Sequence, residues 1–111
     1  MTARQLRELR ETGTEIRLIR STQEKLRETV GSEEKLQGLE TKLTDLIDSY
    51  LHRVERFETE LTVLSPYERT VMRLYYLEGL SWEDVAETVH YSISAVYQLR
   101  RSAIEKITPK K

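Results

Sequence analysis

The stretch LSWEDVAETVHYSISAVYQLRRSAIEKI, residues 80–107, decides the fold of this chain. Ser81 is a helix-start signal ahead of apolar residues at helical spacing, and Ser92 is a second one after the turn-like pair His90-Tyr91. Beyond Ser92, apolar residues recur at intervals of three and four, as one buried helix face requires: Val96, Leu99, Ala103 and Ile107. The stretch therefore predicts two short helices joined by a tight turn, of which the second ends in basic residues.

A third short helix is predicted immediately before this stretch. Ser65 can cap it, Pro66 fits its first position, and Glu68 completes a capping box. Gly79 then ends it, because glycine readily adopts the positive φ of a helix stop. Helices this short are marginal alone, so burial against each other must hold them together. Three short helices with two tight connections, and the small Ala86 on the middle one, match a helix-turn-helix.

The outward face of the last helix carries the side chains that we predict to contact DNA. Gln98 can form a bidentate pair with adenine, and Arg101 can pair with guanine or bind phosphate. The predicted base-reading residues are Ser94, Tyr97, Gln98 and Arg101. The predicted phosphate-binding residues are Ser92, Arg100, Ser102, Lys106, Lys110 and Lys111. Residues 97–111 hold five bases and one acid, so this end can bind phosphates although the chain's net charge is −1.

Residues 36–64 repeat apolar side chains in the three-four alternation of a coiled coil. The residues of this predicted seam are Leu36, Leu43, Ile47, Tyr50, Val54, Phe57 and Leu61. They predict a helix over about residues 33–63, with Gly31 stopping the helix before it and Ser32 as its N-cap. Two helices joined this tightly form an antiparallel hairpin, or else the second pairs with its copy in another chain. The sequence leaves both arrangements open.

Residues 1–30 predict a less regular helix, because their apolar residues follow only an approximate stripe. Gly13, with a threonine on either side, is expected to fray or interrupt it, since glycine costs about 1 kcal/mol in a helix interior. The expected fold is all-α: a long helical hairpin or coiled coil followed by a three-helix helix-turn-helix. We assign residues 1–63 to a charged helical region for oligomerisation or positioning, and residues 64–111 to a DNA-binding domain.

Composition argues against catalysis and against metal or cofactor binding. The absence of cysteine excludes disulfides, thiol catalysis and cysteine-based zinc sites. The chain has no glycine-rich phosphate loop and no HExxH motif, and its two histidines lie 38 positions apart. It also has no apolar signal segment and no run near the roughly 18 apolar residues of a membrane span. We therefore expect a non-enzymatic cytoplasmic protein with no cofactor, no metal and no membrane partner.

The segment LSPYERTVMRLYYLEGLSWEDVAETVHYSISAV, residues 64–96, resembles region 4 of sigma-70-type factors, the part that reads the promoter −35 element. The ending VYQLRRSAIEKI extends the resemblance and implies that Gln98 reads a base. His90 stands where that family's turn normally has glycine, so the turn must close differently or hold His90 in a less favourable backbone region. The whole architecture is similar to small phage and prophage regulators of the ArpU/RinA type. That resemblance implies a phage-encoded transcription regulator.

Three functions follow as hypotheses. The first is a sequence-specific regulator that binds double-stranded DNA through its last helix and self-associates, as a dimer in the first instance, through residues 36–64. The second is a DNA-packaging protein similar to a small terminase subunit. The third is a sigma-like module that binds RNA polymerase. Its docking surface would be acidic and would consist of Glu78, Glu83, Asp84 and Glu87.

Overall fold

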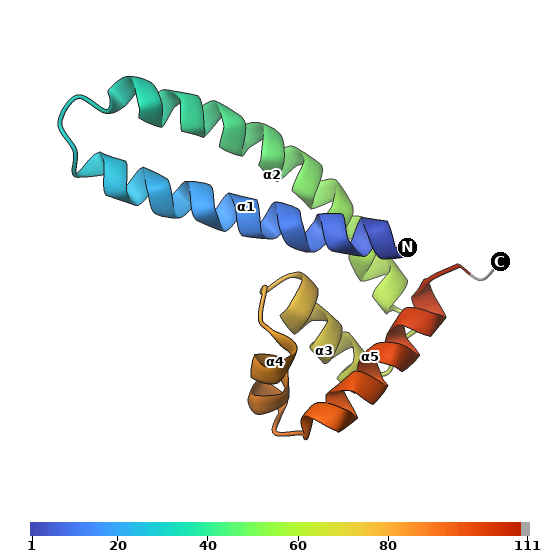
Figure 1. The fold of residues 1–111 in the computed structure, drawn as a ribbon. Helices are drawn as coiled ribbons and strands as arrows, with labels where there is room; N and C mark the ends of the chain where they lie inside the picture. The colour runs from blue at the N-terminus through green and yellow to red at the C-terminus, as the bar shows by residue number, and fades with distance from the viewer. Residues whose placement is uncertain (110–111) are drawn as a thin grey trace.

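The computed structural model describes residues 1–109, and within them the chain folds into five helices and no strand. These are α1 (Ala3–Arg27), α2 (Glu33–Leu61), α3 (Pro66–Tyr76), α4 (Trp82–Val89) and α5 (Ile93–Ile107). Helices α1 and α2 form a long antiparallel hairpin, and the three short helices gather beside its open end (Figure 1). The expected all-α fold is confirmed, in its hairpin form.

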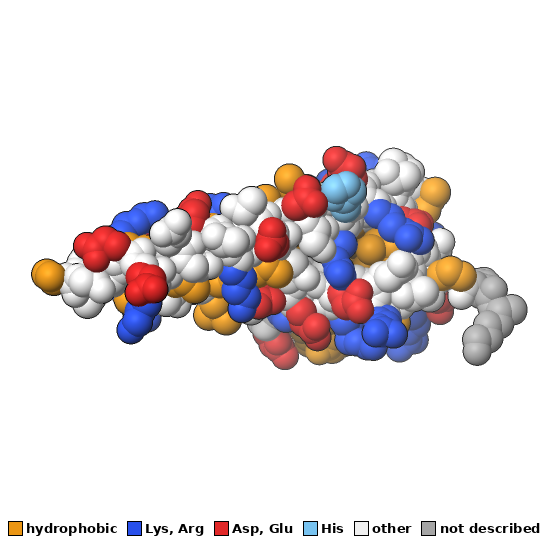
Figure 2. Space-filling model, turned by 90° about the horizontal axis from the view of Figure 1, so that it is seen from above, with side chains coloured by type: hydrophobic (Ala, Val, Ile, Leu, Met, Phe, Trp, Pro, Cys, Tyr) orange, Lys and Arg blue, Asp and Glu red, His pale blue; other side chains and the backbone are white. Residues whose placement is uncertain are grey.

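The hairpin pairs α1 with α2 inside one chain and so decides between the two arrangements left open by the sequence. Away from the short helices, Ile16 and Ile19 of α1 bury against Leu43 of α2. Of the predicted seam, Leu43, Phe57 and Leu61 are buried, while Leu36, Ile47, Tyr50 and Val54 are half-buried. The face of the hairpin seen in Figure 2 carries acidic and basic side chains interspersed. The apolar seam therefore faces the chain's own core.

The connection between α1 and α2 differs from the predicted one in its hydrogen bonding. Helix α1 ends at Arg27 with Glu28 as its C-cap, and Gly31 adopts a φ of 82° three residues later in the connection, so the prediction that Gly31 stops the helix was wrong. Ser32 occupies the N-cap position of α2, but its hydroxyl makes no capping bond there. It donates instead to the carbonyl oxygens of Leu26 at 2.6 Å and Thr29 at 2.7 Å. The predicted capping bond was wrong because this hydroxyl points back to carbonyls at and just after the end of α1 and not to the N–H groups of α2.

Helix α1 runs without a break through Gly13, so the expected interruption was wrong. Gly13 is buried, and a Cβ added there would lie 3.4 Å from the ring of Tyr50. A glycine at this position therefore lets the Tyr50 ring approach the α1 backbone closely. The flanking hydroxyls stay inside the helix, because Thr12 donates to the Glu8 carbonyl at 2.7 Å and Thr14 to the Arg10 carbonyl at 3.1 Å. Packing across the hairpin outweighs the low helix propensity of glycine.

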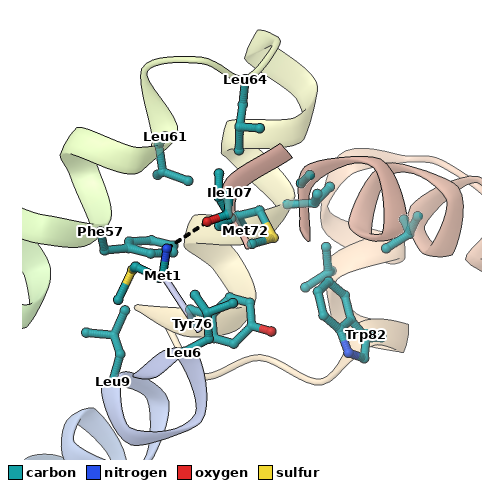
Figure 3. Packing of buried hydrophobic residues seen from close by; sticks show 14 of the residues in the cluster. Met1, Leu6, Leu9, Phe57, Leu61, Leu64, Met72, Tyr76, Trp82 and Ile107 are labelled. Atoms are coloured by element: carbon teal, nitrogen blue, oxygen red, sulfur yellow. Dashed lines mark hydrogen bonds between the residues drawn. The ribbon is translucent and has the colours of Figure 1, made fainter. Parts of the chain in front are cut away.

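One hydrophobic core joins the hairpin to the three short helices (Figure 3). Phe57 of α2 meets Tyr76 of α3 edge to face, with ring centroids 6.0 Å apart. In the same cluster the Met1 ammonium donates to the Ile107 carbonyl at 2.7 Å. The buried members come from every helix: Met1, Leu6, Leu9, Phe57, Leu61, Leu64, Val71, Met72, Tyr76, Trp82, Val85, Ala86, Val96, Ala103 and Ile107. The core is therefore continuous across residue 64.

Two arginines of α1 fix the hairpin against the loop between α3 and α4. Arg10 donates to the carbonyl oxygens of Tyr75 at 3.2 Å, Gly79 at 3.2 Å and Leu80 at 3.3 Å. Arg17 donates to the carbonyl of Leu77 at 3.1 Å. Tyr75 lies in the last turn of α3, and Leu77, Gly79 and Leu80 follow it, so none of these carbonyls has a backbone donor one helical turn further on. The arginines therefore satisfy a helix end and hold the hairpin in one orientation.

Candidate DNA interface

Helix α3 begins as the sequence predicts and anchors the last helix. The Ser65 hydroxyl accepts from the Glu68 backbone N–H at 3.3 Å, and the Glu68 carboxylate accepts from the Ser65 N–H at 2.9 Å. The same buried carboxylate accepts from Lys106 Nζ of α5 at 2.8 and 3.1 Å. One acidic side chain thus closes the capping box of α3 and holds the C-terminal half of α5.

The turn between α4 and α5 closes through His90. Ser81 caps α4, its hydroxyl accepting from the Asp84 N–H at 3.1 Å. At the other end His90 adopts a left-handed conformation, with φ 60° and ψ 38°. The N–H of Tyr91 donates to the Ala86 carbonyl at 3.0 Å and that of His90 to the Glu87 carbonyl at 3.3 Å, which is the Schellman pattern. The usual turn is therefore kept, with His90 in the less favourable backbone region.

We expect His90→Gly to raise the free energy of unfolding by about 1 kcal/mol. A left-handed conformation costs an L-residue roughly 1–2 kcal/mol, and part of that gain is offset because glycine is more flexible in the unfolded chain. Chemical denaturation measures the change. Gly38→Ala is the reverse kind of substitution and should also raise the free energy of unfolding, by up to about 1 kcal/mol, since it adds a Cβ at an interior position of α2 with nothing within 4 Å. A destabilised His90→Gly protein would contradict the expectation and give the imidazole a role of its own.

Helix α5 presents its outer face without obstruction. The Ser92 hydroxyl caps the helix by accepting from the Ala95 N–H at 3.1 Å, and the first turn contains no acid. Val96, Ala103 and Ile107 are buried beneath it, as the sequence predicts. The four predicted base-reading residues are consequently all exposed on the side away from the core: Ser94, Tyr97, Gln98 and Arg101. Their contact with bases stays a prediction.

The predicted phosphate-binding residues are more scattered. Arg100 lies half-buried with its guanidinium 5.1 Å from the centre of the Trp82 ring, and its Nε is buried without a hydrogen-bond partner within residues 1–109. Ser102 is half-buried, Lys106 is bound to Glu68, and the Ser92 hydroxyl is occupied as a cap. Lys110 and Lys111 lie outside the described residues. Phosphate binding by these residues stays a prediction. The hydroxyl of Ser92 and the ammonium of Lys106 already form hydrogen bonds within the chain.

A pair of exposed aromatic residues beside the turn is not apparent from the sequence. Tyr67, at the start of α3, and Tyr91, in the turn before α5, lie with ring centroids 5.4 Å apart. Both remain exposed, by 59% and 37% respectively. They are separated by 24 positions and belong to no helical stripe, so periodicity offers no signal for them. They add an aromatic edge to the surface that borders the N-terminal end of α5.

Comparison with known proteins agrees with this geometry. The family model for sigma-70, region 4 matches residues 60–108, which span α3, α4 and α5. Neither a curated protein nor a solved structure gave a significant match to the chain. Within residues 1–109, no helix has the length and apolar character needed to cross a membrane. The chain therefore contains a sigma-70 region 4-like helix-turn-helix, which is a DNA-binding module.

Proposed function

From this sigma-70 region 4-like module, we propose that the protein is a non-enzymatic, sequence-specific transcription regulator that places α5 in the major groove of DNA. The observation that carries the proposal is the exposed face of α5. Within residues 1–109 the side chains of Ser94, Gln98 and Arg101 are exposed and form no hydrogen bond or ion pair. Such groups on a firmly packed helix are ready to meet base edges without first breaking internal contacts.

The roles within the groove follow from side-chain chemistry. The Gln98 amide can donate to and accept from adenine at once, and the Arg101 guanidinium can donate twice to guanine or bind a phosphate. Ser94 stands in the first turn of α5, the end that enters the groove most deeply in helix-turn-helix proteins. We extend the proposal to a cytoplasmic regulator of phage or prophage origin, on the resemblance to the ArpU/RinA type.

Self-association is also part of the proposal, because one small helix-turn-helix makes few contacts and two joined copies would bind two half-sites. The predicted seam is largely buried within the chain's own hairpin. A dimer would then form through apolar residues that the hairpin leaves exposed, such as Leu18 and Val30. Molar mass in solution, measured with and without DNA, tests this part of the proposal.

We expect Gln98→Ala to relax sequence preference by about 1–3 kcal/mol at one base pair. Selection of bound duplexes from a random pool identifies the preferred site, and titrations with single base-pair changes then measure the preference. Gln37→Ala is the matched control, because Gln37 is an exposed glutamine on α2 far from the recognition surface. Lys110→Ala should instead weaken binding to all sequences alike. Equal losses on every duplex for Gln98→Ala would exclude a base-reading role for Gln98.

A second candidate function is docking on RNA polymerase. It is favoured by the exposed carboxylates on and before α4, which form no ion pair within residues 1–109: Glu78, Glu83, Asp84 and Glu87. A variant with both Gln98 and Arg101 changed to alanine separates polymerase binding from DNA binding, because its binding to purified RNA polymerase can be measured by pull-down. Retained polymerase binding with lost DNA binding would support a polymerase contact made by this acidic surface.

A further inference from the structure

The N-terminal turns of α1 lie next to α5 and are basic. Residues 3–10 contain three arginines and one glutamate. Figure 1 shows the N-terminal end of α1 above α5, and the contact of Met1 with Ile107 confirms that the two are neighbours. A groove of about 480 Å³ runs between them, with Arg7 and Arg10 on its α1 side and Arg100 and Ile104 on its α5 side. The hairpin therefore contributes basic side chains to the surroundings of the recognition helix.

A second groove of about 460 Å³ continues the first along α5. Arg100 and Ile104 line both grooves, and the second adds Tyr97 and Arg101. Tyr97 and Arg101 also belong to the exposed face that we propose to read bases. The two grooves are therefore neighbours along α5, and we call them together the α1–α5 groove.

Cationic groups outnumber acidic ones in the α1–α5 groove. Its four arginines are Arg7, Arg10, Arg100 and Arg101, and its two carboxylates are Glu11 and Glu105. Arg10 is committed to the carbonyls of the α3–α4 loop. Arg7 and Arg101 are exposed and form no hydrogen bond or ion pair within residues 1–109. Two guanidinium groups are thus available to an anion, that of Arg7 in the first groove and that of Arg101 in the second.

We propose that the α1–α5 groove binds a backbone phosphate of the DNA strand bordering the recognition helix, and that Arg7 supplies the contact from α1. The inference rests on the proposed function. An α-helix with its side chains is about 10–12 Å wide and the major groove is about 12 Å wide, so a helix that fills the groove brings its flank against the phosphates. Arg7 and Arg100 lie along that flank of α5. Arginine is well suited to phosphate because its planar guanidinium can donate two parallel hydrogen bonds.

The test compares Arg7→Gln with wild type in the full chain, using the duplex obtained by selection. We expect binding to weaken roughly 3- to 10-fold on every sequence, and the slope of log affinity against log salt to fall by about 0.9, with sequence preference unchanged. Arg20→Gln is the matched control, because Arg20 is an exposed arginine of α1 that lines a separate groove between α1 and α2. It should alter neither quantity. Thermal unfolding of both variants checks that the fold is kept.

Duplexes with a neutral methylphosphonate at single positions locate the contact. One flanking position should weaken wild type and have no further effect on Arg7→Gln, because the charge pair is already lost. If Arg7→Gln kept the affinity and the salt slope of wild type, this inference would be overturned. If Gln98→Ala altered the sequence preference in the same experiment, the proposed function would still stand. A loss confined to some sequences, or a loss of RNA polymerase binding alone, would likewise overturn a phosphate role. If wild type bound no duplex, the proposed function and this inference would both fall.

Discussion

Replacing Phe57 with alanine is expected to lower the free energy of unfolding by about 3–5 kcal/mol. The ring is fully buried where the hairpin meets the short helices. It lies near Met1 and Leu9, and it meets the ring of Tyr76 of α3 edge to face (Figure 3). Its removal leaves a cavity lined by residues of three helices, and none of them can close it without moving against the others.

Phe57→Ala should destabilise the hairpin and the helix-turn-helix together, so that both still unfold in one transition. Trp82 is the one tryptophan of the chain and lies in the helix-turn-helix, so its fluorescence reports on that part. Helical circular dichroism is dominated by the two long helices of the hairpin. Because both parts share one core, the two signals should give the same midpoint in wild type and shift together in Phe57→Ala. Denaturant titration followed by both signals measures this.

Leu51→Ala is the control, since Leu51 lies on α2 but is 54% exposed. Its effect should stay within about 0.5 kcal/mol. A Trp82 transition that keeps its wild-type midpoint while the helical signal shifts would contradict the shared core. The hairpin and the helix-turn-helix would then be independently stable units.

Local features of the fold were predictable because they depend on neighbouring residues alone. Serine at positions 65, 81 and 92 caps α3, α4 and α5 as predicted, since a capping hydroxyl needs only the N–H group three residues on. The inward and outward faces of α5 also follow from helical periodicity, so the exposure of Gln98 was foreseeable. The left-handed conformation of His90 was one of the two alternatives that followed from comparing the turn with its expected glycine.

Features that depend on distant residues were not predictable. Gly13 is tolerated in α1 because Tyr50 packs on it from α2, and no pattern in residues 1–30 indicates that contact. The apolar seam of α2 is equally consistent with a partner chain, since periodicity defines a buried face and not what buries it. The phosphate-binding role of Lys106 stays a prediction, but no sequence pattern indicated that its ammonium would bind Glu68, 38 positions earlier. The α1–α5 groove likewise exists only once the hairpin has docked.

The ion pair between Glu68 and Lys106 makes the stability of the fold sensitive to acid. Burial alone would raise the pKa of the Glu68 carboxyl, but hydrogen bonds from Lys106, Ser102 and Ser65 outweigh it and lower the pKa from 4.5 to about 2. Because the folded-state pKa lies below the ordinary one, the stabilisation is complete above pH 4.5 and is lost as the pH falls toward 2. We expect a contribution of about 2–3 kcal/mol, reduced by solvent screening because the Lys106 side chain is 47% exposed.

Glu68→Gln should remove this part of the pH dependence along with the stability it provides at neutral pH. The neutral amide keeps the size of the side chain but cannot compensate the Lys106 ammonium, and its bond to the Ser65 N–H loses the strength of a charged acceptor. Denaturant titrations from pH 7 down to pH 2 measure both effects. Glu87→Gln serves as the control, because Glu87 is exposed and forms no ion pair within residues 1–109. If Glu68→Gln and wild type lost stability in parallel over this range, acid sensitivity would have to come from other carboxylates.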